Sequence, residues 1–146
     1  MEREETKRYT DGEEAGPQIL VVDDVEMNRV LLCKMLEQHG YICDVACNGQ
    51  EALEKVSNYP YQLVLMDLQM PVMNGLEATW KIRQHKEFHQ PRIVAVTAKN
   101  ALKDQKTCMR MGMDWFLSKP VDIVTLLRVV ELMVLNHTPE GVGLKG

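Results

Sequence analysis

The fold is decided by the stretch Ile19-Leu20-Val21-Val22-Asp23-Asp24, in which four apolar residues lead directly into two carboxylates. A second run, Leu63-Val64-Leu65-Met66-Asp67, has the same form. Short uninterrupted apolar runs are typical of parallel strands that are buried on both faces. Because open α/β sheets bind ligands at the carboxyl ends of such strands, we expect Asp23, Asp24 and Asp67 to meet at one edge of a sheet.

Two more apolar runs end in polar side chains that would reach the same edge. Residues 93–96 are followed by Thr97, and residues 115–118 are followed by Lys119. Three carboxylates, a hydroxyl and an ammonium group together indicate a site for a divalent cation and a phosphoryl group. A single aspartate at a strand end is commonly a helix cap, but capping does not account for acids, hydroxyl and lysine at the ends of different strands.

Strand and helix patterns alternate five times along the chain. Single helices between strands imply right-handed crossovers and a parallel sheet. The predicted fold class is therefore α/β, a doubly wound, flavodoxin-like (βα)5 sheet of order 2-1-3-4-5, in which the first and third strands are neighbours. The pattern predicts strands over 18–23, 42–46, 63–67, 93–97 and 115–118, and helices over 26–39, 49–57, from 75, over 100–111 and over 122–135.

Length, composition and charge are those of one ordinary globular domain. The chain has 146 residues, of which 45% are hydrophobic and 26% are charged. Its net charge of -4 arises mostly in residues 1–16 and is too small to indicate nucleic acid or a membrane as a partner. We expect a disordered tail or linker over 1–17, the domain over 18–135 and a second disordered tail over 136–146.

The four cysteines do not form the pattern of a disulfide framework, because they are not densely spaced and no signal peptide precedes them. We expect free thiols, buried or half-buried, in a reducing compartment. These residues are Cys33, Cys43, Cys47 and Cys108.

Three neighbouring carboxylates repel one another, by about 4 kcal/mol for a pair ~4 Å apart at an effective dielectric of about 20. Either one of them takes up a proton or a cation lies between them. A hard cation of the Mg²⁺ type suits the set, since no Cys or His belongs to it. With Lys119 opposite and Thr97 as a hydroxyl donor, the set fits in-line phosphoryl transfer to a carboxylate.

Four motifs in this order resemble the response-regulator receiver domain of two-component and phosphorelay signalling. They are LVVDD (20–24), LMDLQMPVMNG (65–75), VTA (96–98) and LSKP (117–120), and the resemblance extends from about residue 18 to 135. It implies that Asp67 is the phosphoacceptor. It also implies that Asp24, Asp67 and the backbone carbonyl of Gln69 bind Mg²⁺, with Asp23 acting through a metal-bound water and Mn²⁺ expected as a substitute.

The resemblance further implies a conformational switch. Thr97 would turn toward the phosphoryl group, Lys119 would be the ion-pair partner of that group, and Phe116 would be the switch aromatic. A cis peptide bond before Pro120 is expected as well.

The 65–75 motif and Asn28 are most similar to receivers of hybrid histidine kinases. The expected function is Mg²⁺-dependent transfer of a phosphoryl group from a phosphohistidine donor to Asp67, which switches a partner-binding surface.

Expected partners are a histidine kinase, a histidine phosphotransfer protein or both, with no nucleic acid and no direct membrane contact. A monomer is the favoured oligomeric state. The expected location is the cytoplasm, including the cytosolic part of a membrane-bound hybrid kinase. The alternatives are a free-standing single-domain regulator, and a phosphorylation-silent pseudo-receiver that serves as an interaction module.

Docking of such a partner needs an exposed apolar patch beside the acceptor. Met27 is the candidate, because it follows Asp24 by one helical turn and lies off the stripe formed by Leu31, Leu32 and Met35. The alternative is that Met27 packs against its own domain.

Two other functions of α/β sheets fit the sequence less well. A phosphatase of the haloacid-dehalogenase type needs a second aspartate two residues after its nucleophile on the first strand, whereas Asp23 and Asp24 are adjacent. A flavodoxin-like electron carrier needs a loop rich in hydroxyls and glycine after that strand, whereas residues 24–28 are acidic and would repel a flavin phosphate.

Overall fold

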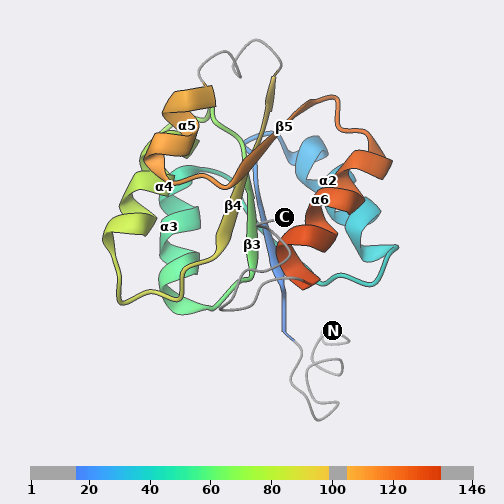
Figure 1. The fold of residues 1–146 in the computed structure, drawn as a ribbon. Coiled ribbons are helices and arrows are strands. Elements are labelled where there is room, and N and C mark those ends of the chain that lie inside the picture. The colour runs from blue at the N-terminus through green and yellow to red at the C-terminus, as the bar shows by residue number, and fades with distance from the viewer. Residues whose placement is uncertain (1–15, 99–104, 136–146) are drawn as a thin grey trace.

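A computed structural model of the protein describes residues 16–98 and 105–135. Strands and helices alternate along this part of the chain (Figure 1). The elements are β1 (Ile19–Val22), α2 (Glu26–Glu37), β2 (Cys43–Ala46), α3 (Gly49–Asn58), β3 (Leu63–Met66), α4 (Gly75–Gln84), β4 (Arg92–Ala98), α5 (Gln105–Met111), β5 (Trp115–Lys119) and α6 (Ile123–Leu135).

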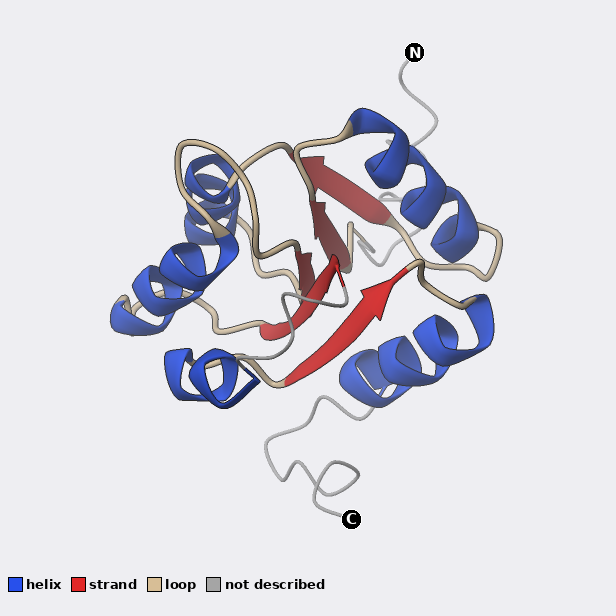
Figure 2. Ribbon diagram, turned by 90° about the horizontal axis from the view of Figure 1, so that it is seen from above, coloured by secondary structure: helices blue, strands red, loops and turns tan. Residues whose placement is uncertain are grey.

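The five strands form one parallel sheet in the order β2-β1-β3-β4-β5, which confirms the predicted topology. Helices α3, α4 and α5 cover one face of the sheet, and α2 and α6 cover the other (Figures 1 and 2). Alternate residues of each strand point to opposite faces, so the core has two halves. Leu20, Val64 and Ile93 pack toward the first group of helices, and Ile19, Leu63 and Val94 toward the second.

The register of the central strands places the acidic residues beside one another. Val22 at the end of β1 pairs with Met66 at the end of β3. The Asp67 N–H then donates to the Val22 carbonyl at 3.0 Å, and the Asp23 N–H donates to the Ala46 carbonyl at 3.1 Å. The ladder therefore continues for one residue beyond the strands and fixes the backbone of both aspartates.

The element boundaries lie close to those expected. Helix α2 ends at Glu37 rather than at residue 39, and Gly40 follows with the positive φ of +92° expected of a left-handed cap. Gly112 ends α5 in the same way, with φ +111°. The expected start of that helix, near residue 100, lies outside the described residues.

The outer surface of α2 differs from the expectation. Leu32 and Leu36 are buried, but Leu31 is 48% exposed, so its predicted place on the buried stripe is wrong. Leu31 lies one turn beyond Met27, which is 63% exposed, and the two share the outward face of the helix. The alternative that Met27 packs within its own domain is therefore also wrong.

All four cysteines are free thiols, and Cys33, Cys43 and Cys108 are half-buried or buried as expected. Cys47 is exposed, because β2 has ended before it and the chain turns toward α3 at the edge of the sheet. The tails predicted over 1–17 and 136–146 lie almost entirely outside the described residues, so the domain boundaries stay a prediction. In the part of the chain that is described, no helix is both long enough and apolar enough to cross a membrane.

Candidate phosphoryl and metal site

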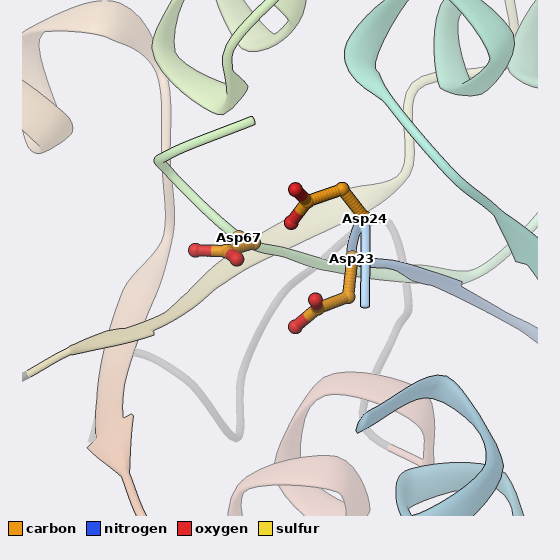
Figure 3. A group of neighbouring side chains, drawn as sticks. All are labelled: Asp23, Asp24 and Asp67. Atoms are coloured by element: carbon orange, nitrogen blue, oxygen red, sulfur yellow. The ribbon is translucent and has the colours of Figure 1, made fainter. Parts of the chain in front are cut away.

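Three carboxylates meet at the carboxyl edge of the sheet. Asp23, Asp24 and Asp67 each have an oxygen within 4.8 Å of the others (Figure 3). Asp23 is 2% exposed and Asp67 is 6% exposed, whereas Asp24 is open to solvent. Two nearly buried acids and one exposed acid therefore share one small site.

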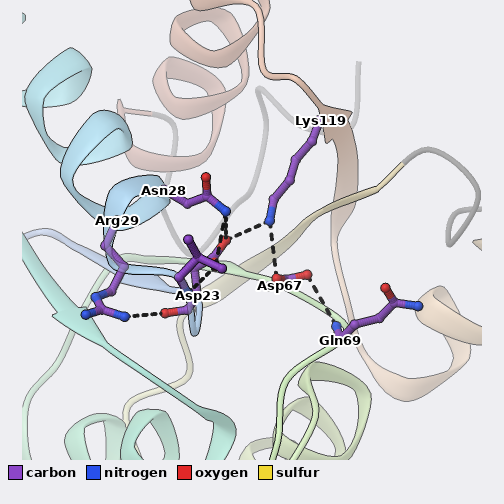
Figure 4. Close-up of polar contacts among 7 residues, drawn as sticks. Asp23, Asn28, Arg29, Asp67, Gln69 and Lys119 are labelled. Atoms are coloured by element: carbon purple, nitrogen blue, oxygen red, sulfur yellow. Dashed lines mark hydrogen bonds and ion pairs between the residues drawn. The ribbon is translucent and has the colours of Figure 1, made fainter.

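Helix α2 holds Asp23 in place (Figure 4). The Val25 N–H donates to Asp23 Oδ1 at 2.9 Å, and Asn28 Nδ2 lies 3.3 Å from both carboxylate oxygens. Arg29 Nη1 donates to the Asp23 backbone carbonyl at 2.7 Å. The sequence analysis did not predict that Asn28 and Arg29 contact Asp23. Their only sign in the sequence is that both are polar residues in the first turns of the helix that follows the acidic pair.

Lys119 bridges the two buried carboxylates. Its Nζ lies 2.7 Å from Asp23 Oδ2 and 3.2 Å from Asp67 Oδ2. Burial disfavours the charged ammonium, but the hydrogen bond to Asp23 and the charge of Asp67 outweigh that effect and raise the pKa of Lys119 above its usual value. The lysine is therefore a fixed positive charge at neutral pH. The expected cis bond between Lys119 and Pro120 is present.

The loop after β3 fixes the other side of Asp67. The Gln69 N–H donates to Asp67 Oδ1 at 3.3 Å (Figure 4). The Gly75 N–H donates to the Leu68 carbonyl at 3.1 Å. A Cβ at Gly75 would overlap the Asp67 carbonyl oxygen. The start of α4 therefore lies so close to this aspartate that only glycine fits at position 75.

Thr97 is fully buried at the end of β4, and its Oγ1 has no hydrogen-bond partner among the described residues. An unpaired buried hydroxyl is costly, and such atoms are rare in folded proteins. Thr97 pairs in register with Ser118, so Phe116 lies on the same face of the sheet two residues earlier. Phe116 is half-buried and stacks on Trp115 with ring centroids 5.2 Å apart.

The donor set fits a hard divalent cation. Lys119 offsets one of the three carboxylate charges, which leaves two negative charges at the site. Asp24 forms no hydrogen bond or ion pair with any described residue, so its carboxylate is available as a ligand, and the cluster contains only oxygen donors. Thr97 and Lys119 add a hydroxyl and an ammonium group at the ends of the adjacent strands, which suits a ligand with several oxygen atoms.

Comparisons with known proteins agree with this geometry. The chain is 42% identical over 120 residues to hybrid signal transduction histidine kinase B from Dictyostelium discoideum, a match that covers 75% of this chain but 6% of that kinase. The chain thus spans a small part of its curated relative.

Two of the solved structures that share this fold are receiver domains of signalling proteins. One is the receiver domain of sensor histidine kinase PA1611 from Pseudomonas aeruginosa PAO1, with a magnesium ion coordinated in its active-site cleft; it is 31% identical, with a TM-score of 0.74 over 82% of this chain and 98% of that one. The other is the receiver domain of the Saccharomyces cerevisiae response regulator Ssk1 in complex with the histidine phosphotransfer protein Ypd1 (31% identical, TM-score 0.75, 82% of this chain and 90% of that one). The family model for the response regulator receiver domain matches residues 19–131. The chain therefore belongs to the response regulator receiver domain family.

Proposed function

We propose that this receiver accepts a phosphoryl group on the Asp67 carboxylate from a phosphohistidine donor in a phosphorelay. The observation that supports this role best is the setting of Asp67. Its side chain is nearly buried at the strand end, with one oxygen facing the Lys119 ammonium and the other facing the Gln69 N–H. Such a carboxylate is positioned as a nucleophile by groups that also neutralise charge.

In the proposed reaction an Asp67 oxygen forms a bond to phosphorus as the P–N bond of the phosphohistidine breaks. The imidazole nitrogen leaves with the bonding electron pair. Lys119 holds the oxygens of the transferred group, and the unpaired Thr97 hydroxyl donates a hydrogen bond to one of them. Asp24, Asp67 and the Gln69 carbonyl would hold a Mg²⁺ (or Mn²⁺) ion, with Asp23 acting through a water, and the bound ion would supply positive charge that lowers the repulsion between carboxylate and donor.

The test of this function is the intact mass of the chain after incubation with acetyl phosphate and Mg²⁺, and separately with a phosphorylated histidine phosphotransfer protein. The expected result is a gain of one phosphoryl group that a chelator prevents. No gain from either donor would overturn the proposal and favour the pseudo-receiver that serves only as an interaction module.

The proposed partner is a histidine phosphotransfer protein, of the kind bound to the Ssk1 receiver. Met27, Val30 and Leu31 form an exposed apolar surface on α2, which begins two residues after Asp24. An exposed apolar surface beside the acceptor is what docking of a phosphohistidine domain requires. We further propose that the chain is the receiver of a hybrid kinase located in the cytoplasm, with the free-standing single-domain regulator as the alternative.

Met27→Asp is expected to slow phosphoryl transfer from the phosphotransfer protein about tenfold, because it places a charge where apolar contact forms. Unfolding should be unchanged, since Met27 contributes little to the core. Rapid-quench measurement of the transfer rate checks this, and the matched control is Met109→Asp on α5, across the sheet from α2. An unchanged rate in the Met27 variant would remove this surface from the docking site.

Thr97→Val is expected to raise the free energy of unfolding by about 1 kcal/mol, because it replaces an unpaired buried hydroxyl with a methyl group. The same variant should lose the change in structure that follows phosphorylation, while Asp67 is still modified. Urea denaturation and amide spectra of the phosphorylated protein measure the two effects. Thr79→Val is the matched control, since Thr79 Oγ1 is also buried and unpaired but lies within α4; loss of the response in both variants would contradict a specific role for Thr97.

A further inference from the structure

A cavity of about 650 Å³ lies at the edge of the sheet opposite to the three aspartates. It is formed where α4 ends and where β4 and β5 begin, and its charged lining residues are Arg83, Lys86, Arg92 and Asp114. The strands are all parallel, so these strand starts and the site of Asp67 lie at opposite edges of the sheet. Cavities of about 300–1,000 Å³ are typical of small-molecule sites. This basic cavity is therefore large enough for a small molecule.

Arg83 is fixed in the basic cavity by the fold. Its Nε donates to the Gly112 carbonyl at 2.9 Å, and its Nη2 donates to Asp114 Oδ2 at 3.0 Å. Its Nη1 donates to the Pro91 carbonyl at 2.8 Å and to Gln90 Oε1 at 2.9 Å. A guanidinium has five N–H donors, so these four bonds leave one N–H, on Nη2, without a described partner.

Positive charge exceeds negative charge in the basic cavity. Asp114 is the one carboxylate among its described lining residues, against three basic side chains. Asp114 Oδ1 lies 3.6 Å from Arg92 Nη1, so both guanidinium groups share this single carboxylate. The Lys86 ammonium forms no hydrogen bond or ion pair with any described residue. Two positive charges are therefore left without a counter-charge.

The two guanidinium groups disfavour each other. Burial is the main cause that lowers the pKa of Arg83; the charge of Asp114 opposes this effect, and the charge of Arg92 adds to it. Both arginines nevertheless stay charged at neutral pH. An anion bound beside both groups would offset this repulsion.

A second groove shows that this excess of positive charge is not general. It has a volume of about 480 Å³ and lies between α2 and the edge strand β2. Its charged lining residues balance one another: Glu26, Glu37 and Asp44 against Arg29, Lys34 and Lys55. Of the two, the basic cavity is the one that favours an anion.

The unused donors of the basic cavity suit a phosphoryl group. The planar guanidinium of Arg92 can donate to two phosphate oxygens at once, and the Lys86 ammonium adds a point charge. A phosphate monoester carries a charge of about −1.5 to −2 at neutral pH, which matches the two positive charges in excess. The volume of the cavity leaves room for the organic part of such a molecule.

We propose that the basic cavity binds a small phosphate monoester, whose phosphoryl group lies between Arg92 and Lys86 and accepts the remaining Arg83 N–H. The ligand is bound and is not chemically changed. It joins the end of α4 to the start of β4, the strand that carries Thr97 toward its far end. A ligand that binds only the folded chain stabilises the fold by mass action. This site is separate from the proposed function at Asp67.

The test is a titration of the full, isotope-labelled chain in the presence of a chelator, which keeps the acidic site free of metal. The probes are glycerol phosphate and AMP, two phosphate monoesters with different organic parts, and adenosine is the uncharged control. Both monoesters should shift the amide resonances of Arg92, Gly112 and Asp114 and reach saturation at millimolar concentration, whereas adenosine should not. Tighter binding of AMP would show that the organic part contributes, and equal binding would show that the phosphoryl group is sufficient.

The affinity should also depend on the charge of the ligand. The second proton of a phosphate monoester has a pKa of about 6, so binding should strengthen between about pH 5 and about pH 7. Added salt should weaken it. No shifts with either monoester, equal shifts with adenosine, or shifts confined to the residues around Asp67 would overturn the proposal.

Matched variants identify the residues that hold the ligand. Arg92→Gln and Lys86→Gln should each weaken AMP binding about tenfold, because a hydrogen bond between charged groups contributes roughly that factor. Neither side chain donates a hydrogen bond to a described residue, so both variants should fold, and thermal unfolding checks this. Lys34→Gln is the control, since Lys34 lines the charge-balanced groove, and it should bind AMP like the unaltered chain.

Unchanged affinity in both cavity variants, or an equal loss in Lys34→Gln, would remove the ligand from the basic cavity. Phosphorylation of Asp67 enters none of these measurements. The failure of this proposal would therefore leave the proposed function standing, and the reverse is also true.

Discussion

An Asp67→Asn variant is expected to lose phosphoryl uptake by at least about a thousandfold, because the amide removes the nucleophilic carboxylate. The loss should not come from unfolding. The Asn carbonyl can still accept the Gln69 N–H, and one of the charges that repel one another in the cluster disappears. The measurement is intact mass after incubation with acetyl phosphate and Mg²⁺, with thermal unfolding recorded on the same sample.

The control for this variant is Asp122→Asn. Asp122 is an exposed carboxylate that caps α6 by accepting the Thr125 N–H at 2.9 Å, and asparagine can accept the same bond. This variant should be phosphorylated as fast as the unaltered chain. Undiminished uptake by Asp67→Asn would show that another carboxylate, Asp23 or Asp24, is the acceptor, and would overturn the assignment of Asp67.

The sheet order and the position of the three acids at one edge were predictable, because both follow from the alternation of short apolar runs and helical segments along the chain. Each central strand is a short apolar run with its acid immediately after it, and parallel strands bring such ends to one edge. The observed pairing of Val22 with Met66 is the register that this pattern requires. Local sequence and global topology agree here, so the inference needed no knowledge of packing.

The different settings of the two adjacent acids could not be predicted from the sequence. Asp23 is buried and bound by Asn28, whereas Asp24 is exposed, and this difference depends on how α2 docks on the sheet. The contact between Asn28 and Asp23 leaves no pattern in the residues that separate the two partners.

The error at Leu31 has a related cause. Helix α2 carries apolar residues on its outward face as well as on its buried face, so helical spacing alone does not distinguish the two. The exposed apolar face of Met27, Val30 and Leu31 is the proposed docking surface, and a rule that places apolar residues inside the protein misplaces part of it.

A Lys119→Met variant is expected to separate the stabilising role of the lysine from its proposed role in phosphoryl transfer. Methionine has a similar length but no charge, so Asp23 and Asp67 lose the ammonium that lies 2.7 and 3.2 Å from them. Removing one partner of a fully buried pair costs 3–5 kcal/mol; Lys119 is 27% exposed, so we expect the free energy of unfolding to fall by about 2 kcal/mol in the presence of a chelator. Phosphoryl uptake should fall about a hundredfold.

Mg²⁺ should restore much of the lost stability but little of the lost activity. A divalent cation bound to the folded site neutralises the same carboxylates and stabilises the fold by mass action. It does not replace the ammonium that would hold the transferred phosphoryl group. The rise in Tm between chelator and millimolar Mg²⁺ should therefore be larger in Lys119→Met than in the unaltered chain, and a variant as stable as the unaltered chain in chelator would contradict this account.

The contribution of Lys119 to the free energy of unfolding should change with pH in one direction only. The pKa of Lys119 in the folded protein lies above the ordinary lysine value of 10.5, so its stabilising effect is fully present below that value and is lost as the pH rises through the folded pKa. The stability difference between the unaltered chain and Lys119→Met should accordingly be constant from pH 7 to about pH 9 and shrink only in stronger alkali. Lys81→Met provides the control, since its ion pair with Glu77 is exposed and should contribute less than about 0.5 kcal/mol at any pH. A difference that already shrinks between pH 7 and pH 9 would mean that the ammonium is not held by the two carboxylates as the geometry requires.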